Sequence, residues 1–155
     1  MKLKCFALSI LSIFFIGATL KKQSLKISLN YLTKEKSKDS NTSNLKYTLF
    51  NGKLTCTSVS QRSGKGKQIY SVQVTKKQIE NLVAIIRKNN LFRNEKIVSE
   101  NDFDTPYTAV LINFKTVLGI KNGNISIYLL TKDVENNKLC SQIQELKSAL
   151  TALLK

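Results

Sequence analysis

Residues 45–59, LKYTLF-NG-KLTCTSV, decide the fold of this chain. The runs on either side of Asn51-Gly52 have the residue types of β-strands. Asn-Gly between two such runs is the strongest short-range signal of a β-hairpin, because a type I′ turn needs a positive φ at both central residues. A third strand is predicted over residues 69–74, after a polar loop at residues 61–67. Region 45–74 therefore predicts a three-stranded antiparallel meander.

A helix is predicted directly after this meander. Thr75 and Gln78 have the spacing of a capping box, in which the threonine hydroxyl accepts from a backbone amide and the glutamine side chain accepts from the Thr75 amide. Asn89-Asn90 would end the helix. The apolar stripe of this helix consists of Ile79, Leu82, Val83 and Ile86.

The second half of the chain repeats the order of strands and then a helix. Strands are predicted over residues 107–115 and 125–130, with a short strand over 117–120, a turn at Asn122-Gly123 and a long polar loop over 94–106. The last helix has apolar residues at steps of four, three, four and three: Leu139, Ile143, Leu146, Leu150 and Leu153. We therefore expect an α+β fold, with an antiparallel sheet (the meander plus a second hairpin) and two amphipathic helices packed on it.

The N-terminal part of the chain is predicted to hold an additional element. Apolar residues from Leu25 to Tyr31 alternate with polar ones, which predicts an ordered arm or an edge strand, and residues 34–44 are typical of a solvated loop. We expect residues 19–44 to form this arm and loop, and residues 45–155 to form a single domain.

The first eighteen residues have the layout of a secretory signal peptide. Lys2 and Lys4 precede an apolar run over residues 5–16, and small residues follow, with cleavage expected near Ala18. The apolar run is short for a membrane span, which needs about 20 residues. An uncleaved signal that serves as an anchor is the alternative, and would be the only contact with a membrane. The expected location is extracytoplasmic, either secreted or periplasmic.

The cysteines suggest a single disulfide bond. Cys5 leaves with the signal peptide, so the mature chain keeps Cys56 and Cys140, an even number in an oxidising compartment. Their bond would close a long loop and contribute ~4 kcal/mol in the chain-entropy model. The alternative is two separate buried thiols.

The chain is strongly basic, which favours an anionic partner. Removal of residues 1–18 takes away Lys2 and Lys4 and no acid, so the formal net charge falls from +15 to +13. Arg62, Lys65 and Lys67 lie beside glycines in the polar loop and are the candidate anion-binding residues. The alternative is a compositional bias towards Lys, Asn and Ile, as in an AT-rich genome. Secretion argues against nucleic acid as a ligand.

The chain contains no histidine, which excludes Ser-His-Asp and Cys-His catalysis and the usual zinc sites. Asp102 and Asp104 could offer oxygens to a hard cation, but their spacing does not match an EF-hand loop, so no metal site and no cofactor are expected. A hydrolase would have to use these aspartates with Glu95 or Glu100.

Several short motifs occur in a familiar order: Tyr47-Thr-Leu, Asn51-Gly52, Val72-Gln-Val-Thr75, Leu91-Phe92 and Asp104-Thr-Pro106-Tyr-Thr108. Over roughly residues 45–154 this order resembles a family of small uncharacterised secreted bacterial α+β domains. The chain has Thr75-Lys-Lys-Gln where that pattern more often carries an acid. The resemblance implies an extracytoplasmic location and no known activity.

These observations together favour a non-catalytic binding or interaction module that acts outside the cytosol. Its partner would be another protein or an anionic surface of the envelope. The second hypothesis is an inhibitor or immunity-type protein that docks the 94–106 or the 61–67 loop on a partner enzyme. The carboxylate-dependent hydrolase is the third.

Overall fold

The computed structural model describes residues 25–34, 43–59, 65–98 and 109–155. These residues form the following elements in chain order: β1 (Leu25–Lys34), β2 (Ser43–Phe50), β3 (Lys53–Val59), β4 (Gly66–Gln73), α1 (Lys76–Lys88), β5 (Asn94–Val98), β6 (Ala109–Leu118), β7 (Lys121–Leu130), α2 (Thr131–Val134) and α3 (Lys138–Ala152).

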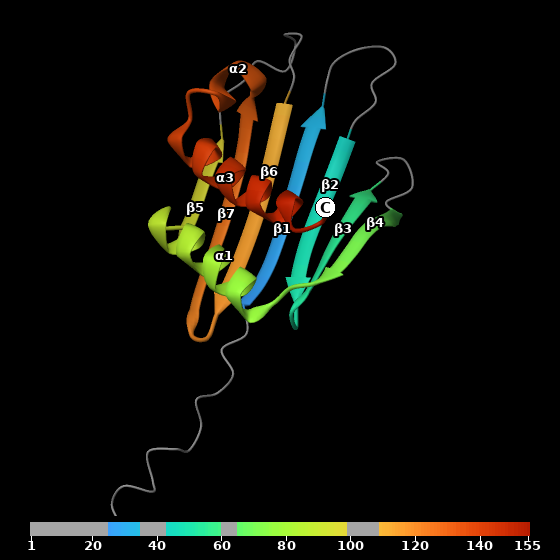
Figure 1. Cartoon of the computed structure of the whole chain (residues 1–155). Coiled ribbons are helices and arrows are strands. Elements are labelled where there is room, and N and C mark those ends of the chain that lie inside the picture. Colours follow the sequence, from blue (N-terminus) through green and yellow to red (C-terminus); the bar gives the residue numbers. More distant parts are fainter. Residues whose placement is uncertain (1–24, 35–42, 60–64, 99–108) are drawn as a thin grey trace, which may run out of the picture.

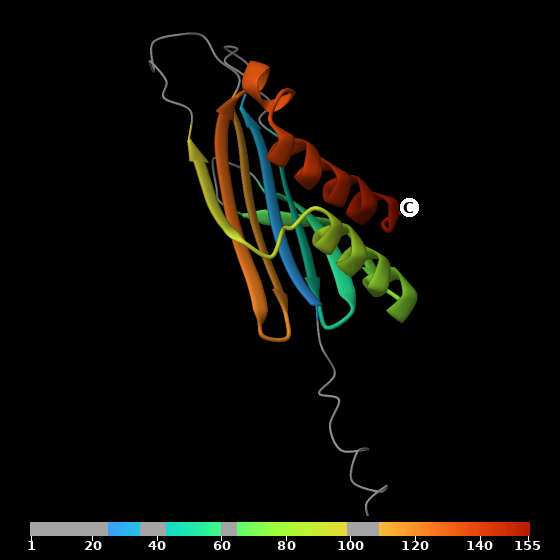
Figure 2. The same ribbon diagram turned by 90° about the vertical axis from the view of Figure 1, so that its left-hand side faces the viewer.

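The strands form one seven-stranded sheet in the order β4-β3-β2-β1-β6-β7-β5 (Figure 1). Every neighbouring pair is antiparallel except β5 and β7, which run parallel. The helices α1 and α3 lie on the same side of this sheet (Figure 2). The fold is therefore α+β, with a meander, a second hairpin and helices packed on the sheet, as the sequence predicts.

The predicted turn of the first hairpin is confirmed by its backbone. Asn51 has a φ of 49° and Gly52 a φ of 75°, and β2 and β3 pair directly up to this turn. Two consecutive positive φ values are the requirement of a type I′ turn, which asparagine and glycine meet at low cost.

The strand at the N-terminus occupies a different place from the expected edge position. β1 is the central strand and pairs with β2 on one side and β6 on the other. Leu25, Ile27 and Leu29 are buried and belong to the same core as the rest of the described chain. Alternation shows that one face of a strand is buried, but it does not reveal how many neighbours the strand has.

The second half of the chain differs from the prediction in three elements. The expected 94–106 loop begins with β5, and α2 was not predicted. The turn between β6 and β7 lies at Gly119-Ile120, where Gly119 has a φ of 58°, and not at Asn122-Gly123. Gly123 is inside β7, where a Cβ would lie only 2.4 Å from the Leu91 carbonyl oxygen. This glycine is therefore explained by a close approach of two backbones rather than by a turn.

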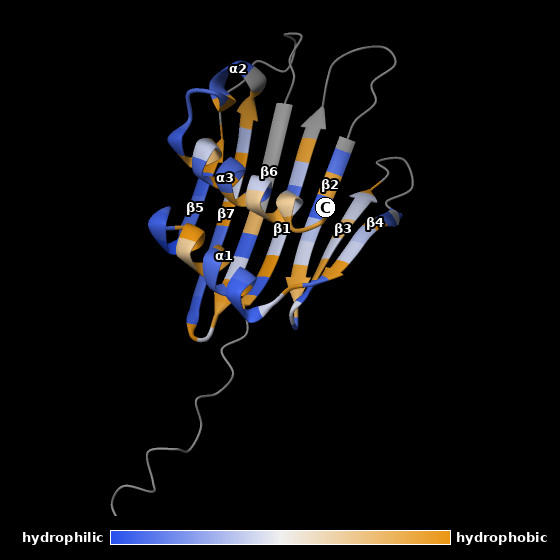
Figure 3. Ribbon diagram, viewed as in Figure 1, coloured by the Kyte–Doolittle hydropathy of each residue, from blue (hydrophilic) through white to orange (hydrophobic). Residues whose placement is uncertain are grey.

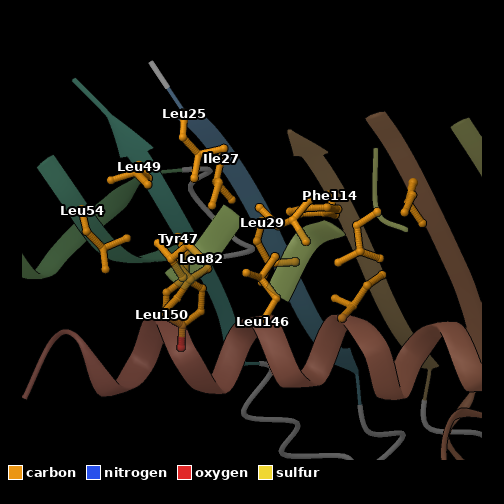
Figure 4. Packing of buried hydrophobic residues seen from close by; sticks show 14 of the residues in the cluster. Leu25, Ile27, Leu29, Tyr47, Leu49, Leu54, Leu82, Phe114, Leu146 and Leu150 are labelled. Carbon is orange, nitrogen blue, oxygen red and sulfur yellow. The ribbon is translucent and has the colours of Figure 1, made fainter. Parts of the chain in front are cut away.

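The core lies between the helices and the sheet. Leu146 and Leu150 point from α3 towards Leu29 and Tyr47, while Leu82 of α1 reaches the same cluster (Figure 4). All five side chains are buried, and each fully buried leucine contributes about 1.5–3 kcal/mol relative to full exposure.

Polar contacts cap α1 and join it to α3. The Gln78 amide donates to the Thr75 hydroxyl at 3.3 Å and the Thr75 amide donates to the Gln78 side chain at 2.8 Å, which confirms the predicted capping box. At the other end, Lys88 Nζ donates to Glu145 Oε1 at 2.9 Å and Asn89 Nδ2 donates to Glu145 Oε2 at 3.0 Å. These hydrogen bonds, that of Asn89 first, lower the pKa of Glu145.

Candidate binding surface

Lysines gather on the side of the sheet opposite the helices. Along each strand the side chains alternate between the two faces, so the neighbours of buried residues point away from the helices. The stripes of opposite hydropathy along the strands follow this alternation (Figure 3). Exposed lysines occupy such positions on five strands, and we call them the lysine face: Lys26, Lys46, Lys53, Lys96 and Lys115.

The sheet register sets the spacing of these charges. Lys26 pairs with Val117 and Ser28 pairs with Lys115, so Lys26 and Lys115 are diagonal neighbours on adjacent strands, about 7–8 Å apart. Lys46 lies two strands away from Lys115, a lateral step of about 10 Å. From β3 to β5 the lysine face spans five strand spacings, or about 24 Å.

The surface between the lysines carries hydroxyl side chains as well as apolar ones such as Phe50, Val98 and Val117. One row across four adjacent strands contains only hydroxyl side chains: Ser71, Thr55, Thr48 and Ser28. The Thr55 hydroxyl also donates to the Thr48 carbonyl at 3.3 Å. Hydroxyls can both donate and accept, so this row can hydrogen-bond a polar ligand held by the lysines.

No carboxylate neutralises the lysine face within the described residues. Glu95 is the single acid of the seven strands; it alternates with Lys96 towards the other face and pairs with Arg93 at 2.7 Å. The remaining described acids lie in the helices or directly after α2: Glu80, Asp133, Glu135 and Glu145. The lysine face is therefore a surface of one charge sign, which attracts anions at long range.

One lysine of this face is held in place by an aromatic ring. Lys26 Nζ lies 4.8 Å from the centroid of the Phe50 ring, which is 49% exposed. A cation–π contact at an exposed site contributes about 0.5–1 kcal/mol. The contact orients the Lys26 ammonium without neutralising its charge.

A second group of titratable side chains lies under α3. Lys147 Nζ is 3.5 Å from the centroid of the Tyr31 ring. Burial lowers the pKa of Lys147, while burial and then the nearby Cys140 raise the pKa of Tyr31. The Tyr47 hydroxyl lies 3.1 Å from the Thr151 hydroxyl.

The two cysteines of this region are buried free thiols, so the predicted disulfide bond is wrong for this structure. Cys56 pairs with Tyr47, whose hydroxyl reaches Thr151 near the end of α3. Cys140 is in the first turn of α3, eleven residues before Thr151, or about 16 Å along the axis. A disulfide needs Cα atoms within about 7 Å, and spacing in sequence does not reveal that distance.

The surroundings of both thiols favour the protonated form. Burial raises the pKa of Cys56 and of Cys140, so both stay protonated at neutral pH. The reactive form of cysteine is the thiolate, which needs an electropositive and accessible environment. Both cysteines belong to the hydrophobic core.

The candidate residues from sequence fall partly outside the described chain. Arg62, Asp102 and Asp104 lie outside the described residues. Lys65 and Lys67 are described and exposed, directly before and within β4. Within the described residues, no group of three or more Asp, Glu and Cys side chains could hold a metal ion.

Sequence reasoning missed the lysine face, although its signal was present. Lys26 occupies a polar position in the alternation of β1, and Lys46, Lys53 and Lys115 follow the same rule in their own strands. Only the sheet order shows that these positions share one face.

Comparison with known proteins adds no relatives: no protein-family model matches the chain, and no curated protein sequence is significantly similar to it. Among the helices that the structure describes, none combines the length and the apolar character needed to cross a membrane.

Proposed function

We propose that the protein is a non-catalytic binding module that acts outside the cytosol and attaches to an anionic surface through the lysine face. The observation that carries the proposal is the set of five exposed lysines on one side of the sheet, with no acid beside them in the described strands. The signal-like residues 1–18 support the location.

The type of cationic side chain also favours binding to an extended anionic surface over recognition of a single phosphate or carboxylate. Lysine is a compact point charge on a flexible stem, whereas arginine provides the rigid fork that recognises a single phosphate or carboxylate. Every cation of the lysine face is a lysine, and the described arginines, Arg87 and Arg93, lie elsewhere. An array of point charges about 24 Å wide suits repeated negative charges.

The test is binding of the mature chain, from Thr19 onward, to immobilised dextran sulfate at low salt. The variant Lys26→Gln, Lys46→Gln, Lys115→Gln removes three charges from the lysine face. We expect about a hundredfold weaker binding, since each lysine near an anionic surface contributes about 1 kcal/mol. Circular dichroism checks that the variant remains folded.

The matched control removes the same charge from the helix side of the sheet. Lys77, Lys132 and Lys138 are exposed residues of α1, α2 and α3. Their triple glutamine variant should bind within about threefold of the wild type, because the removed charges lie outside the contact. Equal losses in the two variants would show that net charge alone causes binding and would refute the proposal, as would a wild type that does not bind.

A further inference from the structure

The two edges of the sheet are protected to different degrees. Natural proteins protect an edge strand by making it short, charging it or covering it, because its unpaired backbone groups can pair with another chain. β5 follows this rule, with five residues that include Glu95 and Lys96. β4 has eight residues, and each of its residues from Gly66 to Ser71 is exposed.

β4 presents apolar side chains at its centre. Ile69 is 45% exposed and Tyr70 is 55% exposed. Tyr70 pairs with Cys56, which is only 4% exposed. The Tyr70 side chain therefore points to the helix side of the sheet, but unlike Cys56 it is not buried there. Both faces and the outer edge of β4 are therefore open to a partner within the described structure.

A bulge produces this arrangement. Cys56 pairs with Tyr70 and Thr57 pairs with Gln68, so Ile69 has no counterpart in β3. A bulge re-aims side chains, and a bulge that twists the strand away is one of the ways in which natural proteins protect an edge. Here the extra residue is an isoleucine, which favours contact with a further strand rather than with water.

We propose that β4 receives an extended, acidic segment of a partner protein, which adds an eighth strand to the sheet. Main-chain hydrogen bonds to the outer edge of β4 would hold the segment, and alternate apolar side chains would cover Ile69 and Tyr70. Lys67, on the same strand, gives this edge a positive charge that attracts an acidic segment. The proposal is independent of the lysine face.

A second copy of this chain fits the edge less well than an acidic partner. β3 and β4 contain Lys53 and Lys67 and no acid, so the paired edges would offer no carboxylate to either lysine. The formal charge of the whole chain is +15, so two copies repel each other on approach.

The probe is a synthetic eight-residue peptide in which glutamate alternates with valine, carrying a rhodamine label for fluorescence anisotropy. Its control has the same sequence with methylated valine nitrogens, which cannot donate hydrogen bonds to a sheet edge. We expect the unmethylated peptide to bind at least about tenfold more tightly, since strand addition depends on main-chain hydrogen bonds. Equal affinities would overturn the proposal, because simple charge attraction does not distinguish the two peptides.

The variant Ile69→Ala, Tyr70→Ala tests the location. This variant should bind the peptide about tenfold more weakly, because two cross-strand side-chain contacts are lost. The matched variant Val98→Ala, Ile120→Ala removes two exposed apolar side chains from other places, since Val98 is on β5 and Ile120 is in the β6–β7 turn. It should bind like the wild type, and an equal loss in both variants would overturn the proposal.

Hydrogen exchange provides a readout on the backbone itself. Amides of β4 should exchange more slowly with the peptide bound, whereas those of β5 should not change. Sedimentation of the protein alone tests self-association. If the wild type forms a dimer and the Ile69→Lys variant is a monomer, the β4 edge binds a second copy of the chain. That result would overturn the proposal of an acidic partner.

Discussion

Gly123→Ala should destabilise the protein by crowding two backbones. A Cβ at this position would lie 2.4 Å from the Leu91 carbonyl oxygen and 2.7 Å from the Arg93 amide nitrogen. An ordinary contact is about 3.4 Å or longer, so β7 and the segment before β5 must separate by about 1 Å. Neither atom belongs to a side chain that could rotate away.

The displacement would act where the parallel pairing of β5 and β7 begins. The Asn124 amide donates to the Arg93 carbonyl at 2.9 Å, and Asn94 and Asn124 are the first paired residues. Overpacking costs about 1–3 kcal/mol, and a weakened backbone hydrogen bond costs about 0.5–1.5 kcal/mol. We expect a loss of about 2–4 kcal/mol, which lowers Tm by about 6–12 °C in a domain of this size.

The assay is urea unfolding followed by circular dichroism, with Gly66→Ala as the control. Neither glycine has a positive φ, so alanine is compatible with the backbone at both positions. At Gly66 the nearest atom to a new Cβ is the Thr57 Cγ2 methyl, at 2.7 Å, on the exposed edge of the sheet. That side chain can move, so we expect a loss under about 1 kcal/mol. A Gly123→Ala variant as stable as the wild type, or as the control, would refute the reasoning.

Three other predictions concern buried or paired groups. Thr116→Val should raise the free energy of unfolding by about 1 kcal/mol, because the fully buried Thr116 hydroxyl has no hydrogen-bond partner among the described residues; a lower urea midpoint would show that the hydroxyl is satisfied. Glu145→Gln should lower stability at pH 7. The pKa of Glu145 is lower in the folded state than in the unfolded state, where it is about 4.3. The contribution of Glu145 to stability is therefore present above the unfolded pKa and is lost as the pH falls through the folded pKa. The urea midpoints of the wild type and the variant should converge in acid. In a chain that begins at Thr19, Cys56 and Cys140 should both react with Ellman's reagent without prior reduction, slowly when folded and quickly in urea, and a count of zero thiols in urea would restore the disulfide.

Local signals in the sequence were sufficient for the elements that depend on local chemistry. The turn at Asn51-Gly52 and the cap at Thr75 follow from the φ preference of glycine and from a side chain that satisfies a free amide. The stripe of α3 follows from helical periodicity: Leu139, Leu146 and Leu150 are buried as predicted, and Leu153 is the half-buried C-cap. These features need no information from distant parts of the chain.

Features that depend on distant segments could not be predicted in this way. The central position of β1 depends on its pairing with β6, which begins 75 residues after β1 ends, at Ala109. The role of Gly123 depends on the path of Leu91, and the separation of Cys56 and Cys140 depends on the direction of α3. The lysine face combines five strands, so it became visible only with the sheet order.

The lysine face and the β4 edge are joined by the sheet that carries both. Ser71 of β4 begins the row of hydroxyl side chains that continues to Ser28, beside Lys115. An acidic strand added at β4 would therefore place negative charge at the border of the lysine face and weaken its attraction for a polyanion. Linkage requires the reverse effect to be equal, so dextran sulfate must lower the affinity of the acidic peptide by the same factor. Because the charges are exposed, this coupling must fade as salt rises, whereas the main-chain pairing at β4 persists. The two proposed contacts thus differ in salt dependence, and a titration at two salt concentrations separates them in one sample.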